Sequence, residues 1–291
     1  MATVELTVKD LEADVHPDWC PGCGDFGVLK SLKEAIVELG IAPHEVLVVS
    51  GIGCSSNLPG FIRTNGVHSL HGRALPVASG AALANHALHV VVVGGDGDGY
   101  GIGIAHFIHA MRRNLNLTYL VMDNEIYGLT TGQASPTTTE GHKTKSTPRG
   151  NVERPVAPLA LALASGATYV ARGFSGDQKQ LTRLTAGAMA HRGFALVDVF
   201  SPCVTFNKLN TYAWFRERVY KLEDEGHDPG DFMGAMQKAI EFGERIPIGL
   251  LYEVDRPTYE DTEPVLARGP LVDQPLGLDR ATLDSILAET M

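Results

Sequence analysis

The sequence predicts an α/β fold built on a doubly wound, mostly parallel sheet. Short apolar runs rich in β-branched residues alternate along the chain with longer segments of helical character, as in repeated strand–helix–strand units. The run at 90–93 is valine throughout and does not alternate with polar residues, which suits a strand covered on both faces. The mixed segment 102–113 is long enough to be a crossover helix, so the next apolar run, at 117–122, is expected to return parallel.

The same alternation continues on both sides of this unit. Gly40 is placed to end the first helix, because glycine readily takes the left-handed conformation found at helix C-termini. This first helix is expected at 26–39. Besides it and 102–113, helices are expected at 75–88, 177–191 and 231–243. Besides 90–93 and 117–122, strands are expected at 45–50, 168–171, 194–200 and 248–254. We therefore expect at least five strands in one α/β domain at 1–209, followed by a helical C-terminal extension at 210–291. That extension is expected to pack on the same domain or on a partner subunit.

Composition limits the partners of the protein. The 291 residues carry a formal net charge of −10, whereas nucleic-acid-binding proteins usually present a basic face. The longest apolar run is far shorter than a membrane span, and the acidic N-terminal segment lacks the hydrophobic region of a signal peptide. We therefore expect a cytoplasmic protein without nucleic-acid or membrane partners.

A glycine-rich stretch, GGDGDGYGIG, follows the strand at 90–93. It contains neither G-x-G-x-x-G nor G-K-[ST], and an EF-hand loop starting at Asp96 would end on Phe107, where a glutamate is required. Asp96 and Asn124 each follow the carboxyl end of a predicted strand, which is where ligands bind in open α/β sheets. Their side-chain oxygens suit a Mg²⁺ ion that also holds phosphate oxygens. The alternative is a tight strand-to-helix turn in which Asp98 caps the helix.

All four cysteines fall on predicted loops. Cys20 and Cys23 form a C-x-x-C in WCPGCG, and Cys54 and Cys203 each follow a predicted strand. In a reducing compartment such cysteines more often bind a metal, or are buried spectators, than form disulfides. If the strands are parallel, these loops meet at the sheet edge that carries Asp96. Four thiolates can hold a [4Fe–4S] cluster or a zinc ion, and the spacing alone does not separate these two.

The segment 126–155, directly after Asn124, has almost no apolar periodicity. A loop of this length inside a compact domain is usually functional or mobile, so we predict that it forms a wall of the active site. His68 and His71 lie in a shorter loop, NGVHSLHGRALP, where a histidine is more often structural than catalytic.

Taken together, these motifs resemble the β subunit of a 2-oxoacid:ferredoxin oxidoreductase, the subunit that carries thiamine diphosphate (ThDP) and an iron–sulfur cluster. The matching stretches are WCPGCG, GIGCSS, HGRALP, GDGDGYGIG, RRN, DNEIYGLTTGQASPTT and SPC, which run from Trp19 to Cys203. The resemblance implies a ThDP-binding fold with three cofactors, namely ThDP, Mg²⁺ and one [4Fe–4S] cluster. The C-terminal third matches only weakly.

The resemblance also implies a role for individual residues. The cluster ligands would be Cys20, Cys23, Cys54 and Cys203, and the Mg²⁺ ligands would be Asp96, Asn124 and the backbone carbonyl of Ile126. The ThDP site would be lined by Ile52, Gly53, Cys54, Ser55, His71, Gly97, Asp98, Gly128 and Leu129. The glutamate that activates ThDP is expected on the α subunit, so no catalytic side chain is assigned on this chain.

The implied reaction is oxidative decarboxylation of a 2-oxoacid with coenzyme A (CoA), giving acyl-CoA, CO₂ and reduced ferredoxin. The motifs look closest to the 2-oxoglutarate branch, whose product is succinyl-CoA. Where some relatives have Lys or Arg after C-S-S this chain has Asn57, so Arg63 or a partner residue is the other candidate to bind the far carboxylate. The expected partners are an α subunit, in a heterodimer or a dimer of heterodimers, and ferredoxin. The alternatives are a pyruvate-specific member, a non-oxidative ThDP-dependent decarboxylase or carboligase subunit, and a non-catalytic subunit.

Overall fold

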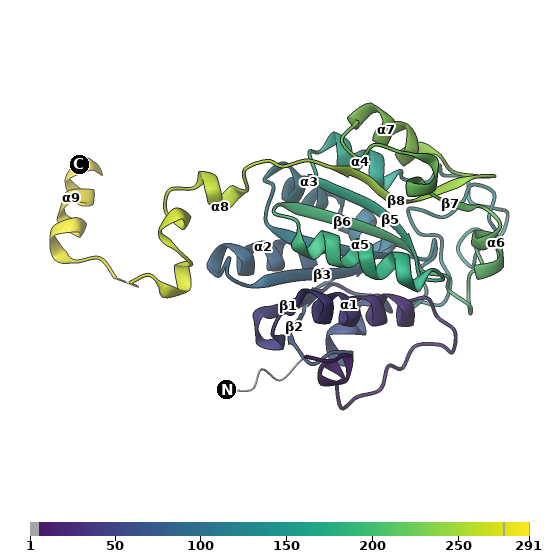
Figure 1. Ribbon diagram of the computed structural model, residues 1–291, viewed down its shortest axis with the longest axis horizontal. Coiled ribbons are helices and arrows are strands. Elements are labelled where there is room, and N and C mark those ends of the chain that lie inside the picture. The colour runs from purple at the N-terminus through teal and green to yellow at the C-terminus, as the bar shows by residue number, and fades with distance from the viewer. Residues whose placement is uncertain (1–5, 276, 291) are drawn as a thin grey trace.

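The computed structural model describes residues 6–275 and 277–290, and within them an eight-stranded sheet runs through the centre of the molecule (Figure 1). The strand order is β2-β1-β3-β4-β6-β5-β8-β7, and every neighbouring pair is parallel except β5 and β8. The doubly wound, mostly parallel sheet predicted from the sequence is confirmed. The strands are β1 Val46–Ser50, β2 Asn65–His68, β3 His89–Gly95, β4 Leu117–Asp123, β5 Tyr169–Phe174, β6 Phe194–Phe200, β7 Val219–Lys221 and β8 Ile246–Glu253.

Helices cover both faces of the sheet. On one face α1 and α5 pack against each other and on the strands, and on the other face lie α2, α3, α4 and α7. The central strands β4 and β6 are buried at every position, as expected for strands with helices on both sides. The helices are α1 Asp25–Leu39, α2 Ala74–Ala84, α3 Ile104–Arg112, α4 Pro158–Ala164, α5 Gln178–Ala190, α6 Tyr212–Arg216, α7 Phe232–Ile240, α8 Tyr259–Thr262 and α9 Arg280–Thr290.

Three helical predictions differ from the structure in detail. The helix after the glycine-rich stretch begins with one π-helical turn, Gly97–Ile102, and α3 follows only after Gly103. The helices expected at 75–88 and 231–243 end at Ala84 and Ile240, respectively. Gly40 does end α1, and its φ of 66° is the left-handed conformation that the sequence predicts.

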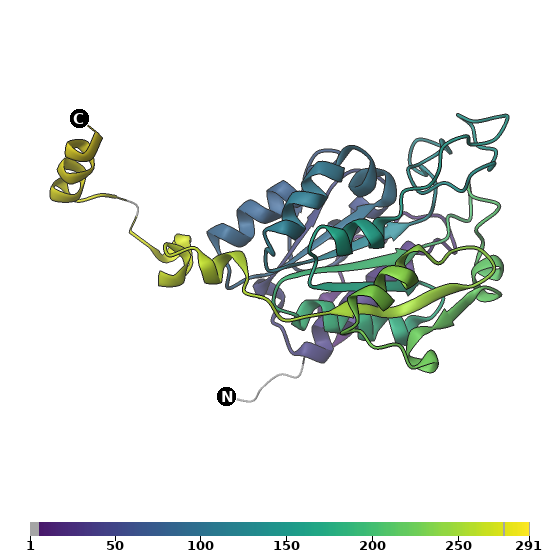
Figure 2. The ribbon, with the colours of Figure 1, turned by 90° about the horizontal axis from the view of Figure 1, so that it is seen from above.

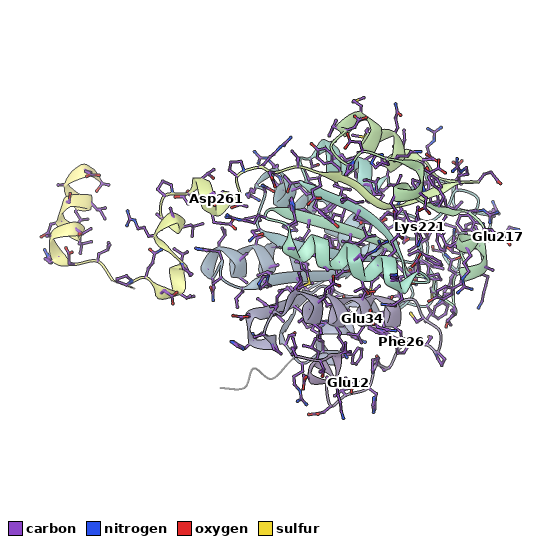
Figure 3. All side chains as sticks on the ribbon, viewed as in Figure 1. Glu12, Phe26, Glu34, Glu217, Lys221 and Asp261 are labelled. Atoms are coloured by element: carbon purple, nitrogen blue, oxygen red, sulfur yellow. The ribbon has the colours of Figure 1, made fainter. Side chains whose placement is uncertain are left out.

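The region 210–291, predicted as a helical extension, contributes α6, β7, α7 and β8 to the sheet and its covering layers. Beyond β8 the chain leaves the body as an arm that ends in α9, at the end of the molecule opposite the long loop 126–155 (Figure 2). In Figure 3 the side chains of α9 stand clear of the body, and none of its residues is buried. Over the residues that the structure describes, none of the helices combines the length and apolarity needed to cross a membrane.

Candidate active site

The carboxyl ends of four neighbouring parallel strands form the edge at which the predicted site residues gather. The loops after β1, β3, β4 and β6 carry Cys54, Asp96, Asn124 and Cys203, respectively. These strands are adjacent in the sheet, so loops that are distant in sequence lie side by side. This is the place where open α/β sheets bind their ligands.

A cavity of about 100 Å³ opens at this edge. Its lining includes every residue that the family resemblance assigns to ThDP or Mg²⁺: Ile52, Gly53, Cys54, Ser55, His71, Asp96, Gly97, Asp98, Asn124, Ile126, Gly128 and Leu129. Gly95, Tyr127 and Thr130 complete it. The structure therefore brings these twelve predicted residues together around one space.

Asp96 is a buried carboxyl group at the floor of this cavity. Its Oδ2 accepts a hydrogen bond of 2.7 Å from the Thr137 hydroxyl, and burial raises its pKa to about 6. On the neighbouring strand, Asn124 Oδ1 accepts from the Ile126 amide at 3.1 Å, which makes a tight turn directly after β4. Within that turn Glu125 takes the left-handed conformation, with a φ of 56°. The turn places Asn124 and Ile126 in the lining of the same cavity as Asp96.

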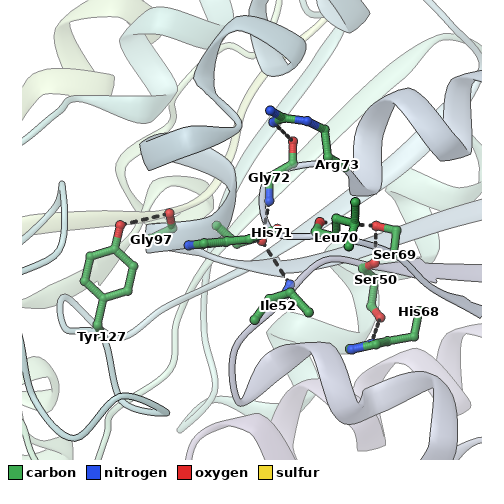
Figure 4. A network of polar contacts seen from close by, with 11 residues as sticks. Ser50, Ile52, His68, Ser69, Leu70, His71, Gly72, Arg73, Gly97 and Tyr127 are labelled. Atoms are coloured by element: carbon green, nitrogen blue, oxygen red, sulfur yellow. Dashed lines mark hydrogen bonds and ion pairs between the residues drawn. The ribbon is translucent and has the colours of Figure 1, made fainter.

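The Asp98 carboxylate holds three loops together. Its Oδ1 accepts hydrogen bonds from the backbone amides of Ile52 at 2.9 Å and Gly72 at 2.7 Å, and His71 Nδ1 lies 2.7 Å away (Figure 4). The side chain of Asp98 thus joins loops, and the prediction that it caps the following helix is wrong.

Tyr127 is a cavity residue that sequence reasoning did not identify. Its hydroxyl donates to the Gly97 carbonyl at 3.1 Å (Figure 4), and a Cβ added at Gly97 would lie 2.1 Å from the Tyr127 ring. Only glycine at position 97 leaves room for this ring. The one signal for Tyr127 in the sequence is its place between two predicted site residues, Ile126 and Gly128.

A second cavity, of about 270 Å³, is lined by all four cysteines. Cys20, Cys23, Cys54 and Cys203 carry free thiols, and they come from three separate loops. A Cβ added at Gly128 would lie 3.6 Å from Cys54 Sγ and 3.7 Å from Cys203 Sγ, so both thiols face the Gly128 backbone. Among the residues that the structure describes, no three His, Cys, Asp or Glu side chains are arranged around a single metal ion. The four cysteines share the lining of this cavity with nine other residues.

Burial raises the pKa of two of the cysteine thiols and of one neighbouring carboxyl group. It raises the pKa of the Cys54 thiol to about 12 and moves that of Cys23 upward as well, with the Asp25 carboxylate adding to both effects. The pKa of Asp25 itself is raised to about 6 by burial, although the Ser201 hydroxyl donates to it at 2.6 Å.

The two candidates for binding the far carboxylate of a substrate lie in different surroundings. Asn57 lines the cysteine cavity, and its Nδ2 is 3.4 Å from Asp18 Oδ1. Arg63 pairs with Asp14 at 3.2 Å, its side chain is 63% exposed, and it lines neither cavity. The structure brings Asn57 to the site and leaves Arg63 outside it.

The fold and the residues at the sheet edge define a ThDP-binding enzyme domain. Residues 51–199 match the family model described as "Thiamine pyrophosphate enzyme, C-terminal TPP binding domain". Residues 203–268 match a second model, which describes the C-terminal part of the pyruvate ferredoxin oxidoreductase beta chain.

Similarity to known proteins shows which family of ThDP-binding enzymes the chain resembles. The chain is 49% identical over 257 residues to a 2-oxoacid:ferredoxin oxidoreductase subunit beta from Sulfolobus sp, covering 84% of each chain. It is 48% identical over 199 residues to the 2-oxoglutarate oxidoreductase subunit KorB of Mycobacterium tuberculosis, covering 68% of this chain and 53% of that protein. A solved 2-oxoglutarate:ferredoxin oxidoreductase from Magnetococcus marinus, with 2-oxoglutarate, coenzyme A and succinyl-CoA bound, superimposes with a TM-score of 0.91 at 43% identity, over 99% of this chain and 97% of that one.

The chain belongs to the family of 2-oxoacid:ferredoxin oxidoreductase β subunits. The resemblance, the fold class and the class of enzyme predicted from the sequence are all confirmed. A β subunit implies an α partner, and the matching domain supports ThDP as a cofactor.

Proposed function

We propose that the first cavity holds ThDP with Mg²⁺, that the second holds one [4Fe–4S] cluster, and that the αβ complex converts 2-oxoglutarate and CoA to succinyl-CoA, CO₂ and reduced ferredoxin. The observation that supports this proposal is that the two cavities share part of their lining. Cys54, Asn124, Gly128 and Leu129 line both cavities. A cofactor that releases electrons and a group that accepts them would therefore be direct neighbours.

The lining of the first cavity fits the proposed Mg²⁺ and diphosphate. Asp96, Asn124 and the Ile126 carbonyl offer hard oxygen ligands, and Mg²⁺ commonly takes only a few of these beside phosphates and water. The buried hydroxyl of Ser55 in the same lining has no hydrogen-bond partner among the residues that the structure describes, so it can bind a ligand oxygen. When bound, ThDP supplies the carbon nucleophile that adds to the keto group and accepts the electrons left when CO₂ departs.

The lining of the second cavity fits a cluster better than a zinc ion. Zinc needs four sulfurs at about 2.3 Å from one point, whereas these four cysteines share the lining of a cavity of about 270 Å³ with nine other residues. Among the described side chains no suitable group of three surrounds a single ion. The raised pKa of Cys54 keeps the free thiol protonated at neutral pH, so cluster binding must displace a proton from it.

The protein between the two cavities has its own part in the reaction. Gly128 presents only backbone to the thiols of Cys54 and Cys203, and a larger residue would occupy part of the cysteine cavity. The Asp98 carboxylate and the Tyr127 ring fix the loops that line the ThDP cavity. The side chains thus position the cofactors, while the activating glutamate is expected from the α subunit.

The preference for 2-oxoglutarate rests on the names of relatives and on the motif forms. The Magnetococcus structure contains 2-oxoglutarate, and several relatives at 40–48% identity are named for 2-oxoglutarate. Other relatives are named only for 2-oxoacids, so pyruvate is the second candidate. A buried far carboxylate needs a cation or several donors, and of the two candidates on this chain only Asn57 lines one of these two cavities.

Dye reduction by the αβ complex tests this proposal. We expect CoA-dependent reduction of a viologen dye, with kcat/KM higher for 2-oxoglutarate than for pyruvate. Arg63→Ala should leave that ratio unchanged, because the Arg63 side chain points to Asp14 and solvent. A higher kcat/KM for pyruvate would contradict the substrate assignment. Release of CO₂ without dye reduction would identify a non-oxidative decarboxylase.

A further inference from the structure

Thr137 is a buried residue in the middle of the long loop, and its hydroxyl reaches two strands of the sheet. Thr137 Oγ1 lies 2.7 Å from Asp96 Oδ2, beyond β3, and 2.8 Å from Asp123 Oδ1, at the end of β4. The side chain is only 6% exposed. A hydroxyl group has one proton, so Thr137 can donate to only one of these two oxygens at a time, and it lies closer to Asp96 Oδ2.

The loop around Thr137 is itself fixed to the turn that follows β4. The Thr138 hydroxyl donates to the Glu125 carbonyl at 2.6 Å and accepts from the Ser135 amide at 2.7 Å. Further along the loop, Asn151 Nδ2 donates to the Thr138 carbonyl at 2.9 Å. These three bonds hold residues 135–138 against the sheet edge, so the position of the Thr137 hydroxyl does not depend on its own contacts alone.

We infer that Thr137 is a positioning residue for the metal site, which orients the Asp96 carboxylate and so couples the long loop to Mg²⁺ binding. This inference rests on the proposed role of Asp96 as a Mg²⁺ ligand. A ligating carboxylate is ionised, and its outer hydrogen-bond partner fixes its rotation and its basicity. Thr137 donates to one oxygen of Asp96, so the carboxyl group cannot turn about its Cβ–Cγ bond without breaking that bond.

The geometry also explains why a long, aperiodic loop is built into this site. Tyr127 near its start packs on Gly97, and Thr137 in its middle bonds to Asp96, the residue before that glycine. The loop therefore contacts the glycine-rich turn at two consecutive residues, one through an aromatic ring and one through a hydroxyl. Removing the Thr137 hydroxyl leaves the contact of Tyr127 with Gly97 in place. A substitution at Thr137 therefore tests the hydrogen bond to Asp96 separately.

The test is calorimetric titration of ThDP into the αβ complex freed of ThDP and metal, at a series of Mg²⁺ concentrations. Thr137→Val keeps the shape of the side chain and removes the hydroxyl, and we expect Mg²⁺-dependent ThDP binding about 10- to 100-fold weaker, the usual cost of losing an outer-shell partner. Thr137→Ser, which keeps the hydroxyl, should restore the wild-type affinity. Thr137→Ala provides a second loss of the hydroxyl if the valine variant does not fold.

Thr118→Val is the matched control. Thr118 is a similarly buried threonine near the start of β4, and its hydroxyl donates to the Ala188 carbonyl of α5 at 3.0 Å, whereas Asn124 follows the opposite end of that strand. Its loss should lower the unfolding temperature and leave the affinity for ThDP unchanged. Equal weakening of ThDP binding by Thr118→Val and Thr137→Val would overturn the inference.

Two further outcomes separate the inference from the proposed function. Wild-type affinity in Thr137→Val, together with loss of ThDP binding in Asp96→Ala, would overturn the role of Thr137 and keep Asp96 as a ligand. Failure of the wild-type complex to bind ThDP in a Mg²⁺-dependent way would overturn both. The expected pattern is loss in Asp96→Ala, weakening in Thr137→Val, and wild-type binding in Thr137→Ser and Thr118→Val.

Discussion

His71 Nδ1 lies 2.7 Å from Asp98 Oδ1, and this contact joins the loop after β2 to the glycine-rich turn after β3. The same oxygen accepts from the amides of Ile52 and Gly72, so one carboxylate organises three loops of the ThDP cavity. His71 is half exposed in this cavity, whereas the Asp98 side chain is almost fully buried. The buried Asp98 carboxylate thus fixes the loops and holds the half-exposed ring of His71.

Asp98→Ala should destabilise the fold as well as the cofactor site. It leaves two backbone amides without their acceptor, and an unsatisfied buried donor costs about 1–3 kcal/mol. We expect a clear fall in the unfolding temperature of the αβ complex and loss of ThDP binding. Asp98→Asn keeps an acceptor oxygen and should retain most of the stability. Equal stability of the alanine and asparagine variants would show that these hydrogen bonds do not organise the loops.

Cys203→Ser tests the cysteine cavity. Three thiolates hold a four-iron cluster poorly, so we expect the iron content of anaerobically purified complex to fall from about four per β subunit to well below that number. ThDP affinity should be retained, because Cys203 lines only the cysteine cavity. Stoichiometric zinc in the wild-type protein in place of iron would contradict the assignment of a redox cluster.

Because the pKa of the buried Glu125 carboxyl group is raised, we expect the stability of the fold to depend on pH. Burial, opposed in part by a hydrogen bond from Thr139, raises its pKa to about 8, against an ordinary value of 4.5. Between these values the folded protein binds more protons than the unfolded chain, so this group's contribution to stability is full below the ordinary pKa and is lost as the pH rises through about 8.

Glu125→Gln should therefore flatten the fall in unfolding temperature over that pH range. Glutamine keeps an acceptor for Thr139 and has no proton to lose. Glu217→Gln is the control, because the Glu217 side chain is 73% exposed and its substitution should leave the pH profile unchanged. Unfolding is best followed in complex freed of ThDP and Mg²⁺, since a bound cation would stabilise ionised Glu125. Parallel profiles for Glu125→Gln and the wild type would contradict the prediction.

The buried strands and the loops that follow them could be predicted from the sequence, because burial on both faces leaves a continuous apolar run. This holds for β3, β4 and β6. In contrast, β2 was missed because all four of its residues are exposed, and β7 because it has only three half-buried residues. Neither strand carries a local hydrophobic signal.

Site residues that belong to sequence motifs could be predicted from the sequence. Site residues that are brought into place only by tertiary contacts could not. The order of the strands places β6 between β4 and β5, which brings the loop of Cys203 next to Asn124, and no local pattern encodes that order. Thr137 bonds to residues 41 and 14 positions away in the sequence, from a loop without periodicity. Its role depends on the folded position of Asp96 and Asp123.

The central claim is that the ThDP cavity and the cysteine cavity work as neighbours across the wall of Cys54, Asn124, Gly128 and Leu129. The direct measurement is electron paramagnetic resonance of the anaerobic, ThDP-loaded αβ complex after mixing with 2-oxoglutarate, without ferredoxin. We predict the signal of a reduced [4Fe–4S] cluster within one turnover, and no such signal in Cys203→Ser or without ThDP. Consumption of 2-oxoglutarate with the cluster remaining oxidised would contradict the account.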